Sequence, residues 1–88
     1  IFMLFMITHA CKDPKAARDR WTNTEEKWDG LELVARYHAI GNTGVVIVRA
    51  NDVGAISRWS MQWDDLFDLD VCPVMEDEEA SEVVAYFQ

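Results

Sequence analysis

The chain of 88 residues contains no lysine or arginine after Arg58. Nine acidic residues lie between Trp59 and Gln88, and the formal net charge of the whole chain is −8. Binding of nucleic-acid phosphates requires lysine and arginine to displace counterions, and anionic lipid surfaces attract the same cations. We therefore expect neither nucleic acid nor a membrane to be a partner.

Cysteine is also scarce, and long apolar runs are missing. Cys11 and Cys72 are the two cysteines, too few for a disulfide framework. The apolar stretch near the start is much shorter than the about 20 residues that a bilayer requires. It also lacks the basic residues and the cleavage site of a secretory signal. These features predict a cytoplasmic protein with free thiols.

Apolar residues make up half of the chain and include four tryptophans, which excludes a disordered protein. A chain of this length accommodates one domain, so we expect a single domain over residues 1–88. A domain this small buries a modest share of its surface, and a second subunit often covers more of it.

Residues 2–7 form a continuous apolar run that ends at Thr8, which is typical of a strand covered on both faces. We predict this strand over Phe2–His9. Caps and apolar spacing predict two helices and three further strands. Their predicted ranges are Pro14–Lys27 and Val53–Trp63 for the helices, and Leu31–Ile40, Val45–Ala50 and Phe67–Val74 for the strands. Near the C-terminus, acidic residues precede apolar ones at helical spacing, which predicts a helix; a strand over Glu82–Phe87 is the alternative.

The order of these elements predicts an α+β ferredoxin-like fold, βαββαβ with a C-terminal helix. Right-handed crossovers then give an antiparallel sheet in the order 4-1-3-2, with two helices on one face. This order makes the first strand central. It also places the strand that contains Pro73 at an edge, where a residue without a backbone N–H is tolerated.

Several segments resemble a small bacterial family, domain of unknown function family 3303. They are Met3-Leu-Phe-Met6, the helix after Asp13, and Trp59 to Trp63 followed by Phe67-Asp-Leu-Asp-Val-Cys-Pro-Val74. The resemblance places the chain within the dimeric α/β-barrel superfamily and implies a ferredoxin-like protomer and a homodimer formed through the sheet. It implies no activity for the family. Relatives in the superfamily include quinone-forming monooxygenases, haem-degrading enzymes, isomerases and regulatory ligand-binding domains, and a shared fold does not choose among them.

Haem-degrading relatives pair a tryptophan with a histidine on the second helix and an asparagine on the first strand. This chain has neither the histidine nor the asparagine at those places. We therefore expect no haem and no other cofactor.

The hairpin between the second and third strands contains a charge conflict. If Gly41 pairs with Gly44, then Arg36 lies opposite Arg49, and like charges in that position destabilise a sheet. The same register places Ile40 opposite Val45 and His38 opposite Ile47. We predict that the two arginines share one negative group: a carboxylate from Glu32, Asp68 or Asp70, or an anionic ligand.

His9 and His38 are weak candidates for a catalytic base, because histidine titrates near neutral pH. No serine or cysteine forms a recognisable nucleophile motif with them. His9 and Cys11 stand two residues apart and could share a strand face, but zinc needs three or four ligands. We expect no metal site.

The tryptophans suggest a pocket for a flat ligand between the helices and the sheet. Trp59 and Trp63, together with Arg36 and Arg49, are the predicted ligand-binding residues. The best functional hypothesis is binding of a small, partly aromatic or anionic molecule. One alternative is a cofactor-free oxygenase or isomerase with His9 or His38 as its base; another is a structural assembly module whose tryptophans only fill the core.

The sheet predicts a homodimer. The residues predicted to face the helices are Leu33, Ala35, Tyr37, Ala39, Gly44, Val46, Val48 and Ala50. The opposite face would then expose an apolar patch formed by Val34, Ile40, Val45 and Ile47 with residues of the first strand. A patch of this kind marks an interaction surface.

Overall fold

Four antiparallel strands form one sheet in the order β2-β3-β1-β4, as the sequence predicts. The computed structural model describes residues 3–88, so the predicted strand start at Phe2 lies outside the described residues. β1 pairs with β3 on one side and with β4 on the other, which makes it a central strand. The strand bounds are Met3–Cys11 for β1, Leu31–Ala39 for β2, Thr43–Ala50 for β3 and Phe67–Val74 for β4.

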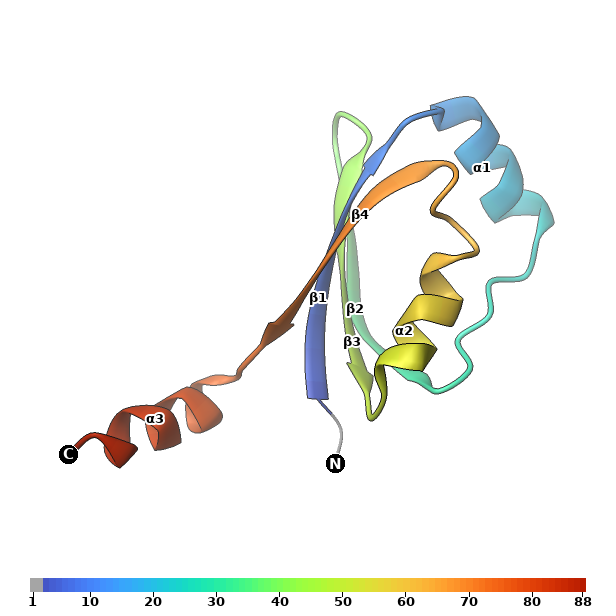
Figure 1. The fold of residues 1–88 in the computed structure, drawn as a ribbon. Coiled ribbons are helices and arrows are strands. Elements are labelled where there is room, and N and C mark those ends of the chain that lie inside the picture. Colours follow the sequence, from blue (N-terminus) through green and yellow to red (C-terminus); the bar gives the residue numbers. More distant parts are fainter. Residues whose placement is uncertain (1–2) are drawn as a thin grey trace.

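Two helices, α1 (Pro14–Asn23) and α2 (Val53–Ser60), lie over the same face of the sheet (Figure 1). Each begins at the aspartate that the sequence marks as a cap. The side chain of Asp13 accepts a hydrogen bond from the backbone of Ala16 at 3.2 Å, and Asp52 accepts one from Ala55 at 2.7 Å. The observed order is βαββαβα, so the predicted α+β ferredoxin-like fold is confirmed.

Both helices end earlier than predicted. α1 stops before Thr24 because that residue has an extended backbone, with φ −129° and ψ 137°. α2 stops at Ser60, and the chain continues through turns in which Trp63 N donates to Ser60 O at 2.9 Å. Trp28 and Trp63 fit a helical pattern in the sequence, yet each lies in an irregular segment beyond a helix.

The core lies between α2 and the middle of the sheet. Side chains from β1 and β3 alternate toward the helices, and Ile7, Val46 and Val48 are completely or almost completely buried. Burial of such aliphatic side chains is the main stabilising contribution to a small domain. The cluster consists of Phe5, Ile7, Val46, Val48, Ala50, Ile56, Trp59 and Trp63.

The predicted register of the β2–β3 hairpin is wrong, because the turn is longer than two residues. Ala39 pairs with Thr43, and residues 40–42 form the loop. Gly41 and Asn42 both have a positive φ, of 98° and 68°, which glycine and asparagine adopt more easily than other residues. The backbone carbonyl of Asn42 also accepts a hydrogen bond from Cys11 N at 2.8 Å, which fixes this turn to the end of β1.

A β-bulge at Val34 changes which side chains of β2 face the helices. Leu33 pairs with Val48, but Ala35 already pairs with Ile47, so the alternation shifts by one residue. The prediction that Ala35, Tyr37 and Ala39 face the helices is therefore wrong. Tyr37 is 66 % exposed on the bare face, while Arg36 and His38 turn toward the helices.

The prediction that the two arginines share one negative group is also wrong. Arg36 lies opposite Val46, and Arg49 lies opposite Glu32 and Leu4, so the two guanidinium groups are on opposite faces of the sheet. Arg36 pairs with Glu26 and Arg49 pairs with Glu76, each at a distance of 2.8–2.9 Å.

The C-terminal segment is a helix, α3 (Asp77–Tyr86), and not the alternative strand. It projects away from the sheet at the end of β4 (Figure 1), and all of its apolar side chains except Ala80 are exposed. The radius of gyration is 15.0 Å, compared with about 12 Å for a compact chain of this length. Within the described residues, no helix is both long and apolar enough to cross a membrane.

Candidate functional site

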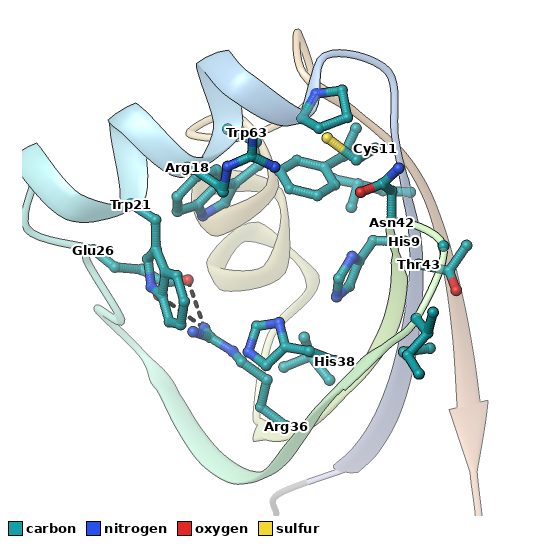
Figure 2. Close-up of a pocket in the computed structure, with 18 of the residues that line it drawn as sticks. His9, Cys11, Arg18, Trp21, Glu26, Arg36, His38, Asn42, Thr43 and Trp63 are labelled. Carbon is teal, nitrogen blue, oxygen red and sulfur yellow. Dashed lines mark hydrogen bonds and ion pairs between the residues drawn. The ribbon is translucent and has the colours of Figure 1, made fainter.

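A cavity of about 400 Å³ lies between the sheet and the two helices that cover it (Figure 2). Polar side chains in its walls come from the sheet and from Arg18 of α1, and apolar or aromatic ones come from the sheet, α1, α2 and the turn after α2. The residues that matter for its chemistry are His9, Ala17, Arg18, Trp21, Glu26, Arg36, His38, Trp59, Trp63 and Phe67.

On the outer side of the cavity, α1 is fastened to the turn after α2. Arg20 binds both carboxylate oxygens of Asp65, at 2.6 and 2.8 Å, and the backbone carbonyl of Gln62 at 2.8 Å. The hydrogen bond from Arg20 lowers the pKa of the Asp65 carboxyl. Ala17 is the buried residue of α1, and its small side chain leaves room above the sheet.

A buried carboxylate, Glu26, organises one wall of the cavity. Its two oxygens accept hydrogen bonds from Nη2 of Arg36, both at 2.8 Å, and its Oε2 also accepts one from Nε1 of Trp59 at 2.8 Å. The side chains of Arg36 and Glu26 are only 16 % and 9 % exposed. A charge that is removed from water must be paired and hydrogen-bonded, and here each partner satisfies the other.

The segment that carries Glu26 is held in place by Gln62. The side-chain amide of Gln62 donates to the backbone carbonyl of Lys27 at 2.8 Å and accepts from its backbone N–H at 2.9 Å. These two hydrogen bonds hold residues 24–27 in an irregular conformation, where the sequence predicts a helix. Glu26 can therefore reach the cavity from an irregular segment.

Aromatic rings surround the ion pair. The guanidinium of Arg36 lies 4.9 Å from the ring centroid of Trp28, and Trp28 stacks on Trp59 with centroids 5.7 Å apart. The ring centroids of Trp21 and His38 are 5.1 Å apart, and Trp21 covers the outer side of the Arg36–Glu26 pair (Figure 2). Cation–π and stacking contacts fix the guanidinium plane, so this wall is rigid.

His9 forms the opposite wall, and its imidazole lies directly above Gly44. A Cβ atom at Gly44 would come within 2.6 Å of the ring, so only glycine leaves space for it there. The centroid of the ring is 6.4 Å from that of His38 and 5.2 Å from that of Phe67. Burial, followed by the charges of His38 and Arg36, lowers the pKa of His9, so the ring is neutral at pH 7.

Two buried polar atoms in the walls have no hydrogen-bond partner within residues 3–88. They are Nδ1 of His9 and Nε1 of Trp63. Buried polar groups in native proteins are nearly always paired, so each exception requires an explanation. Both residues line the same cavity, but these two atoms have almost no accessible surface and point into the packed protein rather than into the open space.

Three of the four predicted ligand-binding residues, Trp59, Trp63 and Arg36, line this cavity, and so do both histidines. Arg49 lies elsewhere, on the bare face of the sheet, where it pairs with Glu76. Several residues of the site were not predicted, among them Arg18, Glu26, Phe67 and Gly44. Glu26 carries no motif that would have identified it. Gly44 lies opposite both histidines in the sheet, and this pairing is visible only once the true register is known.

Cys11 lines the cavity beside His9, while Cys72 is exposed on the edge strand β4. Between Met3 and Gln88, no group of three or more His, Cys, Asp or Glu side chains is arranged to hold a metal ion.

The fold and the cavity define a small α+β protein of ferredoxin-like architecture with an aromatic, partly polar hollow between sheet and helices. The chain belongs to the family described as domain of unknown function (DUF3303), whose model matches residues 3–88. No curated protein and no solved structure matches the chain.

Proposed function

We propose that this protein binds a small, partly aromatic molecule in the cavity between the sheet and helices α1 and α2. The observation that carries the proposal is the cavity itself, which has aromatic walls together with the polar side chains of His9, Arg18 and His38. Ligand sites are typically apolar hollows of 300–1,000 Å³ with a few polar groups that fix orientation. The two histidines, two arginines and three tryptophans in its lining favour a ligand site over imperfect core packing.

A cavity-filling substitution tests this proposal. Ala17→Leu enlarges a buried side chain of α1 that lines the cavity, and Ala16→Leu makes the same change at a neighbouring position that does not. We expect naphthalene-sized ketones, phenols and carboxylic acids to change the tryptophan emission of the unmodified protein and of Ala16→Leu, but not that of Ala17→Leu. If no compound changes the emission of the unmodified protein at concentrations up to about 1 mM, the proposal is wrong.

We further propose that the bare face of the sheet is covered by a second copy of this chain, as in a dimeric α/β barrel. The accessible surface is 6335 Å², whereas a compact monomer of this mass exposes about 5,300 Å². The excess of roughly 1,000 Å² is similar to the about 800 Å² that each partner loses in a stable interface.

The position of α3 also supports a second copy as the partner. An isolated helix of about ten residues is marginal in water, so α3 requires a surface to pack against. Its exposed apolar residues, which include Val83 and Val84, extend from the end of β4, beside the bare face. A two-fold dimer would give each α3 such a surface on the other copy.

Sedimentation at low micromolar concentration tests the dimer. We expect the unmodified chain to sediment at twice its mass of 10.1 kDa, and Ile47→Asp, on the bare face, to sediment as a monomer. Val53→Asp introduces the same charge at an exposed apolar residue on the other side of the sheet and should leave the dimer intact. A monomeric unmodified protein would contradict this proposal without affecting the first.

A further inference from the structure

One face of α1 lines the cavity, and it carries a single charged side chain. Residues three and four positions apart share a side of a helix, and the lining residues of α1 follow this spacing: Pro14, Ala17, Arg18 and Trp21. Three of them are apolar, as expected of a helix face that is turned toward a core. Arg18 is the exception. It is an exposed residue as well as a lining residue, so it lies where the cavity opens to solvent.

The two arginines of the lining differ in their partners. Arg36 binds both carboxylate oxygens of Glu26 at 2.8 Å, so this pair adds no net charge to the cavity. Arg18 forms no ion pair within residues 3–88, although the chain has 16 acidic residues and only 8 basic ones. The cavity of this acidic protein therefore carries one positive charge that the described residues do not neutralise.

The sequence around Arg18 explains why no carboxylate of its own helix pairs with it. Its neighbours three and four positions away are Pro14, Lys15, Trp21 and Thr22, and none of them is acidic. Asp65, in the turn to which α1 is fastened, is already bound by Arg20 at 2.6 and 2.8 Å. The guanidinium of Arg18 can therefore bind a negative group from outside the chain.

The electrostatic field inside the cavity also favours an anion. After burial, the charges of His38 and Arg36 are the causes that lower the pKa of His9. Neighbouring charges that lower the pKa of a histidine make the potential at its ring positive. Figure 2 shows Arg18 at the end of the cavity opposite Arg36 and Glu26, so an anion at Arg18 stays away from the carboxylate of Glu26.

On these grounds, and resting on the ligand-binding function proposed above, we infer that the cavity takes an aromatic carboxylate. The guanidinium of Arg18 binds the carboxylate at the mouth of the cavity, since the planar fork of arginine matches the two oxygens of a carboxylate. The ring of the ligand lies deeper, against Trp63 and Phe67, whose own rings meet edge to face with centroids 5.8 Å apart. The charge thus sets the orientation, with the acid group toward solvent and the ring toward the sheet.

Calorimetric titration with two compounds of the same shape tests this inference. 2-Naphthoate and 2-naphthamide share one ring system and differ in the charge of the attached group. We expect 2-naphthoate to bind about 5–50-fold more tightly at low ionic strength, a preference between that of an exposed and that of a buried charged hydrogen bond. Sodium chloride at about 1 M should reduce this preference, because salt screens an ion pair at the mouth of a cavity.

Two matched variants of α1 identify the cation. Arg18→Gln should bring the two affinities within about twofold of each other, because the ion pair is what separates them. Lys15→Gln removes the same charge from an exposed residue of the same helix that does not line the cavity, and should retain the preference.

The outcomes separate this inference from the function on which it rests. Equal affinities for the two compounds on the unmodified protein, or a preference that survives Arg18→Gln, would overturn the carboxylate assignment alone. Absence of binding by both compounds, and by the ketones and phenols tested above, would contradict the ligand-binding function itself.

Discussion

The two faces of the sheet place their apolar residues in different environments. On the helix-covered face, the β1 side chains of Phe5 and Ile7 lie in a closed core under α2. On the bare face, the next residues of the same strand, Leu4 and Met6, are half-buried and have no helix above them. Because side chains alternate along a strand, one apolar run serves both faces.

Polar groups occur on both faces, but in different surroundings. The covered face contains an ion pair and two histidines around a cavity, whereas the bare face carries the exposed Arg49–Glu76 pair beside apolar side chains such as Tyr37 and Ile47. A covered polar hollow is unusual for a structural core, and apolar side chains without a covering layer are typical of an interaction surface. The difference points to a ligand on one face and a partner chain on the other.

The largest expected difference between the two faces is in the stability lost when a residue is truncated. Ile7→Ala should lower the free energy of unfolding by about 3–5 kcal/mol, because the side chain is completely buried and leaves a cavity. Met6→Ala, at the neighbouring position on the bare face, should cost clearly less when measured on the monomer. Urea denaturation at concentrations where the dimer has dissociated measures both, and equal losses would contradict the distinction between the faces.

The two arginine–glutamate pairs provide the next comparison. Glu26→Gln leaves a buried guanidinium without its charged partner and should destabilise the protein by about 2–3 kcal/mol. Glu76→Gln breaks a pair of almost the same length, 2.9 Å, whose side chains are 37 % and 64 % exposed, and should cost less than about 1 kcal/mol. Thermal denaturation compares the two variants. A larger loss for Glu76→Gln would show that Glu26 does not organise the cavity wall.

Removal of α3 tests the bare face. A chain that ends at Glu76, and so retains the Arg49–Glu76 pair, should keep the stability of its monomer within about 0.5 kcal/mol, because α3 buries almost nothing within its own chain. The same truncation should weaken dimerisation, which sedimentation equilibrium measures. If dimerisation is unchanged, α3 has no part in the interface.

The smallest expected effect is on the pH dependence of stability. The pKa of His9 is lowered in the folded protein. The unfolded chain therefore binds more protons than the folded protein once the pH falls below 6.5. The contribution of neutral His9 is therefore complete above pH 6.5 and is lost as the pH falls toward the pKa of the folded state. His9→Gln should show a flatter dependence below pH 6.5 in urea titrations, and an identical slope would contradict the burial of His9.

Much of the fold could be predicted from the sequence because its signals are local. The caps at Asp13 and Asp52 begin helices, Pro73 lies in an edge strand, and the apolar run around Ile7 forms the central strand. The β2–β3 register could not be predicted, because it depends on a three-residue turn at Gly41 and on the β-bulge at Val34, which has no recognisable sequence pattern.

The candidate site was only partly predictable for the same reason. Trp59 and Trp63 were identified by residue type, which is visible in the sequence. The role of Arg36 was misjudged because its facing direction depends on the bulge at Val34. Glu26 was missed because its position depends on a helix that ends early and on the contact between Gln62 and the irregular segment after it.

The indole N–H resonances test most directly the claim that the hollow on the covered face is the ligand site. A ¹⁵N-labelled sample gives one cross-peak for each of the four tryptophans. On saturation with a naphthalene-sized ketone, we expect the peaks of Trp21, Trp59 and Trp63, which line the hollow, to move, while the backbone amides of Met6 and Ile47 stay in place. Unmoved peaks of these three tryptophans at saturation, with shifts concentrated at Met6 and Ile47, would contradict the account.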